Sequence, residues 1–523
     1  MIHKVELVML PEDVADESKQ LELASQMLNT HQIRIKALRI LKRSIDARSK
    51  QVKYRLTIEV FVDENPPPVK NIKDFFSFEK DVSKADTVLI VGFGPAGMFA
   101  ALRLIELGRK PIIIERGKNV QQRRRDLAAI NKEGLINSNS NYCFGEGGAG
   151  TYSDGKLYTR SNKRGDIHRI LDILILHGAD EDIRVNAHPH IGTNKLPKIV
   201  EAIRETILSA GGEIYFNTRL SNIITKNNSL KGILTVDVIS GEEKIFNGSS
   251  LILATGHSAR DIYELLNKNK ILIEAKPFAL GVRIEHPQVI IDTIQYHCKD
   301  RGEFLPPASY SLTHQYNGRG VYSFCMCPGG IIAPAATGQE EIVVNGWSPS
   351  KRNNPFSNSG IVVSVNEQDY LPYKSLGPLA ALKYQQKAEH NAYLAGKGKL
   401  CAPAQRMIDF VNGKISKDLP SCSYLPGITS SELSELFTKE INTALKEALQ
   451  SFGKKMKGYY TNEAILVGVE SRTSSPVRIP RDDETLQHPQ IKGLYPCGEG
   501  AGYAGGIVSA AMDGERCAEK ICQ

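Results

Sequence analysis

Residues 86–117 read DTVLIVGFGPAGMFAALRLIELGRKPIIIERG, and this stretch decides the fold. It starts with a short apolar run at 88–91, followed by a glycine-rich turn and an apolar segment with helical spacing at 96–107. A second apolar run at 111–114 then ends at Glu115. This order of strand, tight turn, helix, strand and acid is typical of a complete dinucleotide-binding unit, whereas three spaced glycines alone would be weak evidence.

Each part of this unit has a physical role toward a dinucleotide. Gly92 allows a sharp turn out of the first strand, Gly94 lets the backbone approach a diphosphate, and Gly97 lets the helix lie close to the sheet. The N-terminus of the helix presents unpaired N–H groups and the positive end of its dipole to the phosphates. Glu115 lies where an acid accepts hydrogen bonds from a ribose hydroxyl. The residues predicted to contact the ligand here are Gly92, Gly94, Pro95, Ala96, Gly97, Glu115 and Arg116.

Two further glycine-rich segments predict additional contacts to the same ligand. The first reads GEGGAGTYSDGKL at 145–157, and the second reads GLYPCGEGAGYAGGI at 493–507. Flexible loops of this kind can present backbone N–H groups to a large anionic ligand. The second segment predicts a short strand, a glycine-rich turn and a helix that begins at about Ile507. The residues predicted to bind are Gly148, Gly150, Ser153, Asp154, Gly155, Lys156, Gly498, Glu499, Gly505, Gly506 and Ile507.

These motifs resemble the FAD group that includes succinate dehydrogenase flavoprotein and the aromatic hydroxylases. The strings GEGGAGTYSDGKL, ATGHSARD, FALGVRIEHPQ, CMCPGG and GEGAGYAGGI together look like a narrower family, the bacterial FAD-dependent dehydrogenases or NAD(P)/FAD-dependent oxidoreductases. The resemblance covers essentially the whole chain. It implies a cofactor and a fold, and it assigns no substrate.

The resemblance also implies how FAD is held. The first unit would bind the ADP half, with Leu220 near the adenine, and the strand that ends in Thr255 and Gly256 would close the domain. Gly498 and Glu499 would reach the ribityl chain or diphosphate, and the helix after them would point at the flavin. A cation at Lys156 near the ring would raise the flavin's reduction potential.

The predicted fold class is α/β, or α+β overall, in three parts. Residues 1–83 would form a small N-terminal α/β sandwich, ferredoxin-like in topology. Residues 84–275 and 459–523 would form a Rossmann-like FAD domain with a helix at 196–210 and a β-meander. Residues 276–458 would form an inserted, sheet-based cap over the flavin, with an amphipathic helix at 432–452. The three meander strands are expected at 213–220, 221–226 and 230–239.

Catalytic residues are not decided by the sequence, and several candidates have ordinary structural alternatives. Cys325 and Cys327 form a C-x-C that is either a redox pair or nucleophile beside the flavin or a buried strand end. Arg283 and Glu285 share a strand face and either orient an anionic substrate or pair with each other. The other candidates are His286, Lys156, His257, which could instead cap the following helix, and Arg260, Arg472, Ser474, Ser475 and Arg478.

The sequence composition argues against a membrane-spanning protein and against a disulfide-rich secreted protein. The chain has 523 residues, 41% hydrophobic and 24% charged, which is ordinary for a soluble globular protein of two or three domains. We expect a cytoplasmic protein, because no apolar signal region follows Met1 and no apolar run approaches about 18 residues. The nine cysteines form no disulfide framework, and no second C-x-C or C-x-x-C completes a metal site, so we expect reduced thiols and no metal.

The sequence leaves three hypotheses for function. The first is an FAD-dependent oxidoreductase acting on a small molecule, with the flavin carrying the electrons. Its donor is open and NAD(P)H is one possibility, although the single G-x-G-x-x-G unit is already assigned to FAD. The second is an FAD-containing protein that docks RNA through the basic stretch 31–55, in a chain of net charge +8; a solvated charged face is the alternative. The third is FAD in a purely structural role.

Overall fold

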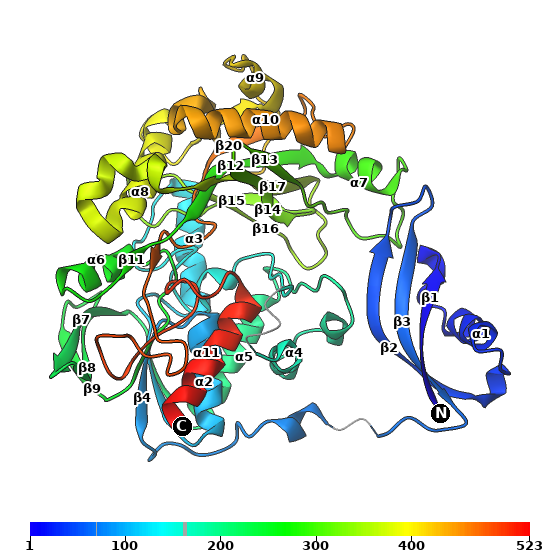
Figure 1. The fold of residues 1–523 in the computed structure, drawn as a ribbon, viewed down its shortest axis with the longest axis horizontal. Coiled ribbons are helices and arrows are strands. Elements are labelled where there is room, and N and C mark those ends of the chain that lie inside the picture. The colour runs from blue at the N-terminus through cyan, green and yellow to red at the C-terminus, as the bar shows by residue number, and fades with distance from the viewer. Residues whose placement is uncertain (69–70, 160–164) are drawn as a thin grey trace.

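The computed structural model describes residues 1–68, 71–159 and 165–523. Figure 1 shows a lower layered domain, an upper sheet covered by helices, and a small N-terminal sheet to one side. The lower domain is built on a five-stranded sheet in the order β22-β10-β4-β5-β6, in which every neighbouring pair is parallel. Its strands are β4 (Thr87–Val91), β5 (Lys110–Ile114), β6 (Glu213–Tyr215), β10 (Leu251–Leu253) and β22 (Leu494–Pro496).

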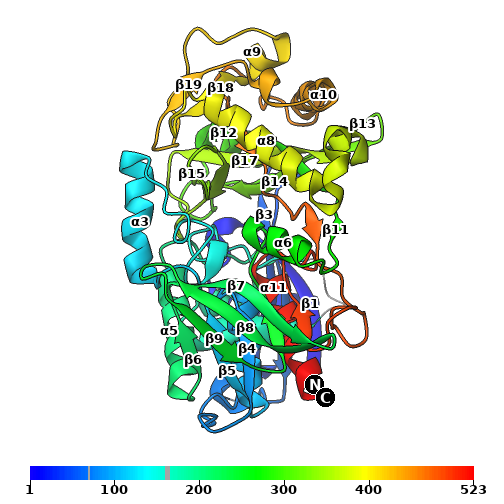
Figure 2. The ribbon, with the colours of Figure 1, turned by 90° about the vertical axis from the view of Figure 1, so that its left-hand side faces the viewer.

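Both faces of this sheet are covered, which is why its strands are continuous apolar runs. Val88 and Ile90 point into a core with helices on one face, while Leu89 and Val91 point into a core with the meander on the other. The meander lies in front of β4 and β5 in the view of Figure 2. The helices of this domain are α2 (Pro95–Glu106), α3 (Val120–Glu133), α4 (Ile167–Leu176), α5 (Leu196–Ser209), α6 (Arg260–Lys268) and α11 (Ile507–Cys522).

The meander is shifted along the chain from its predicted place. It consists of β7 (Thr218–Lys226), β8 (Ser229–Asp237) and β9 (Glu243–Asn247), whereas 213–215 forms β6 at the edge of the parallel sheet. Asn217 has a left-handed φ of 54°, which interrupts the extended backbone between β6 and β7. The predicted division at 220 and 221 is wrong because that point is a bulge within one strand, between Leu220 and Asn222.

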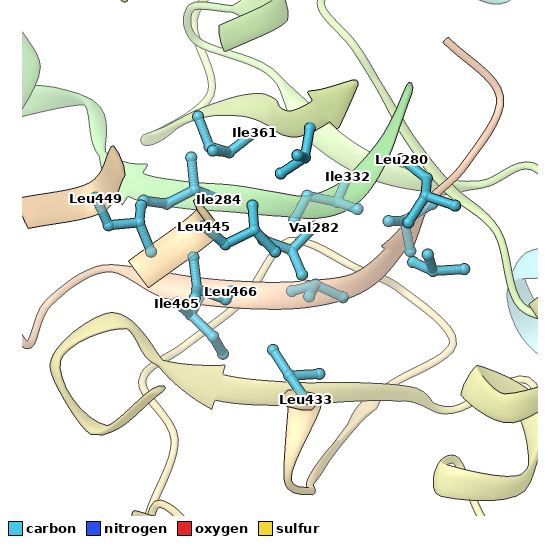
Figure 3. Close-up of a cluster of buried hydrophobic side chains, with 14 of the residues drawn as sticks. Leu280, Val282, Ile284, Ile332, Ile361, Leu433, Leu445, Leu449, Ile465 and Leu466 are labelled. Atoms are coloured by element: carbon cyan, nitrogen blue, oxygen red, sulfur yellow. The ribbon is translucent and has the colours of Figure 1, made fainter. Parts of the chain in front are cut away.

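The upper part is a seven-stranded sheet in the order β13-β14-β17-β12-β20-β18-β19, accompanied by the β15–β16 hairpin. In Figure 3, Leu445 and Leu449 pack onto Val282 and Ile284 of the central strand. The strands are β12 (Phe278–Pro287), β13 (Thr313–Tyr316), β14 (Arg319–Cys327), β15 (Ile331–Pro334), β16 (Val344–Trp347), β17 (Phe356–Val365), β18 (Ala402–Arg406), β19 (Ile428–Ser430) and β20 (Ile465–Glu470). The helices are α7 (Gln288–Tyr296), α8 (Ala380–Ala395), α9 (Met407–Asn412) and α10 (Lys439–Lys455).

Two predicted boundaries in the cap differ from the structure. Strand β20 pairs with β12 and β18, so residues 465–470 belong to the cap sheet and not to the FAD domain that was predicted to resume at 459. The predicted helix 432–452 is a 3-10 turn at Leu433–Leu436 followed by α10, because Phe437 and Thr438 have extended backbone. A two-stranded pairing of β11 (Glu274–Ala275) with β21 (Val477–Arg478) lies where the chain passes between the two parts.

The N-terminal part is smaller than a ferredoxin-like domain. It contains β1 (Ile2–Met9), α1 (Glu17–Met27), β2 (Ile35–Asp46) and β3 (Lys53–Val62), with β3 between the other two strands. This is the strand order of the first half of a ferredoxin-like fold. A second helix and fourth strand do not follow in residues 63–68 and 71–86 before β4 begins. Strand β2 contacts the FAD domain, where Arg43 exchanges backbone hydrogen bonds with Val185 and Ala187.

Candidate functional site

Three glycine-rich segments that are far apart in sequence meet at one point. A Cβ atom built on Gly150 would lie 3.4 Å from Pro95 Cγ at the start of α2 and 3.4 Å from Ile507 Cγ1 at the start of α11. The two helices also pack closely, since a Cβ on Gly514 would lie 2.1 Å from the carbonyl oxygen of Ala96. The structure therefore brings together the three segments predicted to bind one ligand.

The N-termini of α2 and α11 are left free to bind an anion. Both helices begin at a glycine, Gly94 and Gly506, and neither receives a capping hydrogen bond from a side chain at that position. The unpaired N–H groups of a helix start carry partial positive charge and bind phosphate or carbonyl oxygens. Gly97 has the expected packing role, because a Cβ there would lie 2.0 Å from the carbonyl oxygen of Gly92.

Glu115 holds the glycine loops together. Its buried carboxylate accepts hydrogen bonds from the backbone N–H groups of Phe93 at 2.9 Å, Gly117 at 2.8 Å and Gly145 at 3.0 Å. Phe93 and Gly145 belong to the first and second glycine segments. A carboxylate has about four acceptor positions, so Glu115 retains capacity for the ribose hydroxyl that the motif predicts.

The C-terminal segment is held by a residue that sequence reasoning missed. The N–H of Gly498 donates to Asp513 of α11 at 2.8 Å, and Arg481 donates to the same carboxylate at 2.6 and 3.0 Å. Cys497 and Cys517 lie near Asp513, with the three possible metal-ligand atoms within 4.8 Å. Because Arg481 already neutralises that carboxylate, the group is better explained as support for the Gly498 turn than as a metal site.

Glu499 and the strand end at Thr255 and Gly256 lie beside each other. A Cβ on Gly500 would lie 2.5 Å from the carbonyl oxygen of Gly256, and Oε2 of Glu499 lies 3.2 Å from Nδ1 of His257. His257 does not cap the following helix, because α6 begins at Arg260 and its N-cap residue, Ala259, has no side-chain capping hydrogen bond.

These residues fit FAD. Along the site, a Cβ on Gly94 would meet nothing closer than Gly148 Cα at 3.8 Å, and a Cβ on Gly256, Gly505 or Gly506 would meet no protein atom within 4 Å. Open space beside a row of glycines, at two uncapped helix starts, is a cradle for an extended diphosphate ligand.

The predicted adenine end is more enclosed. Leu220 is buried in the core between the sheet and the meander. Arg116 donates to Asp261 at 2.9 Å and to Asn139 at 3.0 Å, and its guanidinium lies 4.3 Å from the centre of the Phe144 ring. The structure therefore shows Arg116 anchoring the loop that carries Phe144, a contact that the motif did not predict.

A small cavity of about 40 Å³ lies between the second glycine segment and the cap. Ala149 and Ser153 form one wall, and Ala335, Asn345 and Trp347 from the β15–β16 region form part of the other. Trp347 is the chain's single tryptophan, a signal that the sequence analysis left unused.

Another group of candidates forms one cluster, which Arg283 joins to the cavity wall through Asn345 at 3.5 Å. Its members are Lys156, Cys325, Cys327 and Arg283. Lys156 Nζ lies 3.7 Å from Cys325 Sγ and 3.8 Å from Cys327 Sγ. Arg283, which is 0% exposed, donates to the carbonyl oxygen of Cys325 at 2.9 Å and pairs with Glu470 at 2.8 Å. Four of the catalytic candidates, Lys156, Arg283, Cys325 and Cys327, therefore lie together.

The structure decides against one alternative that the sequence left open for β12, and it places His286 away from the other candidates. Arg283 does not pair with Glu285, whose carboxylate instead accepts from the N–H of Ser423 at 2.8 Å. His286 lies in the cap core, where its Nε2 is 2.9 Å from the carbonyl oxygen of Tyr459 and burial lowers its pKa to about 4. It is separate from the Lys156 cluster because its side chain points to the opposite face of the strand from Arg283.

Arg260 and Arg472 are paired with carboxylates rather than free for substrate. Arg260 pairs with Glu341 at 3.0 Å and Glu389 at 2.6 Å, and Arg472 pairs with the same two residues at 2.7 and 3.1 Å. The network joins the start of α6 to the cap.

Comparison with known proteins identifies the family. Residues 277–473 match the model described as "FAD-dependent protein, C-terminal domain-like", and residues 1–61 match a domain of unknown function, DUF8436. An uncharacterized protein of Clostridium beijerinckii is 42% identical over 516 residues, which cover 95% of this chain and 94% of that protein. The chain belongs to this family of FAD-dependent proteins. FAD is its cofactor, and the Rossmann-like α/β fold predicted for it is confirmed.

Three solved structures are similar to this chain at a low level. A geranylgeranyl bacteriochlorophyll reductase-like protein of Thermoplasma acidophilum is 14% identical, with 83% and 78% of the two chains covered and a TM-score of 0.34. Quinol fumarate reductase FrdA of E. coli is 13% identical, with 83% and 70% covered and a TM-score of 0.35. Glycine oxidase of Bacillus cereus is 15% identical, with 83% and 94% covered and a TM-score of 0.29. Similarity at this level does not extend to activity or substrate.

The helices and the surface ion pairs bear on two further expectations, those for a membrane and for RNA. Among the described residues, no helix is both long enough and apolar enough to cross a membrane. Each of the five arginines in the basic stretch 31–55 pairs with a carboxylate, and neither the fold nor the comparisons support the RNA hypothesis. The ion pairs are Arg34–Asp63, Arg39–Glu59, Arg43–Asp182, Arg48–Asp46 and Arg55–Glu6.

Proposed function

We propose that this FAD-dependent protein is an oxidoreductase, dehydrogenase-like in reaction, whose small-molecule substrate binds where the cap meets the second glycine segment. The observation that carries the proposal is the position of Gly150, which touches the starts of both α2 and α11 and lies next to Ala149 on the cavity wall. A cofactor held by the two helix starts would thus lie next to the cavity. FAD, when bound, supplies the electron-transfer chemistry of the reaction.

The chain's own residues would position and tune the reaction. The starts of α2 and α11 would hold negative charge through their N–H groups, and Glu115 would keep the two turns in place. Lys156 follows Ser153 of the cavity wall by three positions, and its cation would stabilise negative charge that develops nearby. Asn345 and Ser153 are polar groups on the wall that can orient a substrate.

Anaerobic reduction of the purified holoprotein tests this function. We expect the absorbance of oxidised flavin to bleach when NADH, NADPH or one member of a metabolite panel is mixed with the protein in a stopped-flow instrument. Bleaching identifies the donor and an ensuing reoxidation by a second compound identifies the acceptor. A holoprotein that every donor leaves oxidised, while dithionite reduces it, would support the structural role for FAD instead.

A further inference from the structure

The two cysteines of the C-x-C motif share one cation. Lys156 Nζ is 3.7 and 3.8 Å from the two sulfur atoms, and Arg283 Nη2 is 3.6 Å from Cys327 Sγ. Arg283 also packs against the cavity wall, since a Cβ on Gly346 would lie 2.2 Å from its Nη2. Arg283 therefore links the pair of thiols to the wall of the proposed substrate cavity, since it contacts both Cys327 and Gly346.

The charges around the pair leave one positive charge unbalanced unless a thiol ionises. Three cations face the cluster, Lys156, Arg283 and Arg352, and two carboxylates oppose them. Glu470 pairs with Arg283 at 2.8 Å, and Asp154 pairs with Arg352 at 2.8 Å and more distantly with Lys156 at 3.5 Å. His190 faces the same group, and burial lowers its pKa, so it is neutral at neutral pH. One thiolate balances the cluster.

A hydrogen bond indicates which cysteine this is, because Cys327 Sγ donates its proton to the carbonyl oxygen of Cys325 at 3.2 Å and Cys325 is left as the thiolate. Strand β14 is bulged between Phe324 and Cys327, and Cys325 has the left-handed φ of 49°, which is costly for a residue other than glycine. A hydrogen bond from Cys327 lowers the pKa of the Cys325 thiol, and Lys156 and Arg283 lower it further, against the opposing effect of burial. The same hydrogen bond and burial raise the pKa of Cys327.

We propose that Cys325 and Cys327 form a thiol–disulfide exchange site for a small-molecule disulfide or its thiol. The Cys325 thiolate attacks one sulfur of the substrate, its S–S bond breaks, and the first thiolate leaves and takes a proton from water. Cys327 then loses its proton to the second leaving group and attacks the Cys325 sulfur of the mixed disulfide. In total, two cysteines are oxidised to one disulfide and one substrate disulfide is reduced to two thiols. The inference deepens the proposed function by naming a substrate class, and it rests on that function for FAD as the redox partner.

A second thiol beside the first favours sulfur over carbon electrophiles. A mixed disulfide at Cys325 can be resolved by Cys327, whereas a carbon adduct cannot. A disulfide across C-x-C is geometrically strained, and strained disulfides are more easily reduced and are found in catalytic and regulatory roles. The cysteine pair is thus suited to alternating between the dithiol and the disulfide form rather than to stabilising the fold.

The reaction of the holoprotein with bis(2-hydroxyethyl) disulfide tests the proposal. Reduced protein is incubated with the reagent, quenched with acid, alkylated and analysed by peptide mass spectrometry. We expect an internal disulfide in the 325–327 peptide of the wild type and a stable mercaptoethanol adduct on Cys325 in Cys327→Ser. Because the pKa of Cys325 is lowered, its thiolate persists as the pH falls, and at about pH 6 it should react roughly tenfold faster than partly buried Cys298.

Variants of Lys156 separate this chemistry from a structural effect. In Lys156→Met, Cys325 should no longer react faster than Cys298 at about pH 6, whereas in Lys156→Arg it should still do so. Lys198→Met, which changes an exposed lysine of α5, should match the wild type. A Cys325 rate that follows that of Cys298 at every pH, or an unmodified Cys327→Ser, overturns the inference. The wild-type pH profile needs no variant to fold. Flavin reduction is measured separately, so a protein whose flavin is reduced but whose Cys325 is unreactive loses this inference alone.

Discussion

A Gly94→Val variant is expected to fold as the wild type does and to bind FAD on the order of a hundredfold more weakly, about 2.7 kcal/mol. Gly94 has φ of −84°, which valine adopts without strain, and a Cβ there would meet nothing closer than Gly148 Cα at 3.8 Å. The described residues thus leave room for a Cβ atom at position 94. A diphosphate at the start of α2 would fill that room, because only glycine lets the backbone come close to it.

The measurement is FAD titration of apoprotein, together with circular dichroism and thermal unfolding without FAD. Gly320→Ala, on the cap strand β14, is the control for adding a side chain to a glycine with ordinary backbone, and it should bind FAD normally. Gly97 cannot serve for this test, because its Cβ would lie 2.0 Å from the carbonyl oxygen of Gly92 and would disturb the fold itself. Wild-type affinity in Gly94→Val would mean that the diphosphate lies elsewhere.

The local pattern was sufficient to predict the first unit. Strands expected at 88–91 and 111–114 are observed at Thr87–Val91 and Lys110–Ile114, with the helix at Pro95–Glu106. These segments are short apolar runs separated by glycines, and such runs are the strongest signal in a single sequence. The start of α11 at Ile507 was predicted for the same reason, since a glycine-rich turn precedes it.

Strand β2 could not be recognised in this way. Residues 35–46 carry many basic side chains. Most residues of this strand, on both of its faces, are half-buried. Apolar and polar positions therefore do not alternate cleanly along it. From the sequence, the basic residues of 31–55 indicate either a surface that docks RNA or a solvated charged face. The strand character of β2 comes from pairing with β3 along nearly its whole length, which is a tertiary effect that local pattern does not contain.

The sequence predicted several residues of the site one by one, but it did not predict that they lie close together in space. Lys156 and Cys325 were both candidates, but 169 positions separate them and only the folded chain places them 3.7 Å apart. Arg352 and Asp513 were missed altogether, because an arginine in a loop and an aspartate in a helix carry no signal until Asp154 and Gly498 lie beside them. Supporting residues of this kind are determined by packing between distant elements.

Replacing Glu389 with glutamine is expected to destabilise the protein by about 3–5 kcal/mol, because it leaves buried arginine charge uncompensated. Glu389 is 0% exposed, and its carboxylate accepts from Arg260 Nη2 at 2.6 Å, Ser471 Oγ at 2.6 Å and Arg472 Nη2 at 3.1 Å. Glutamine keeps the shape but removes the charge, and its amide group must face one of the two guanidinium groups as a second donor.

Urea unfolding monitored by tryptophan fluorescence measures this effect, since Trp347 lies on the cavity wall between cap and FAD domain. Glu205→Gln, which changes a glutamate that is 63% exposed and paired with Arg204, is the matched control and should cost at most about 0.5 kcal/mol. Arg260 starts α6 of the FAD domain and Glu389 lies in α8 of the cap. The loss of the Glu389 charge should therefore separate the cap from the FAD domain at a lower urea concentration than either hydrophobic core unfolds. The Trp347 signal should therefore change at lower urea than the far-ultraviolet circular dichroism, and coincident transitions at the wild-type midpoint would show that the network does not hold the cap in place.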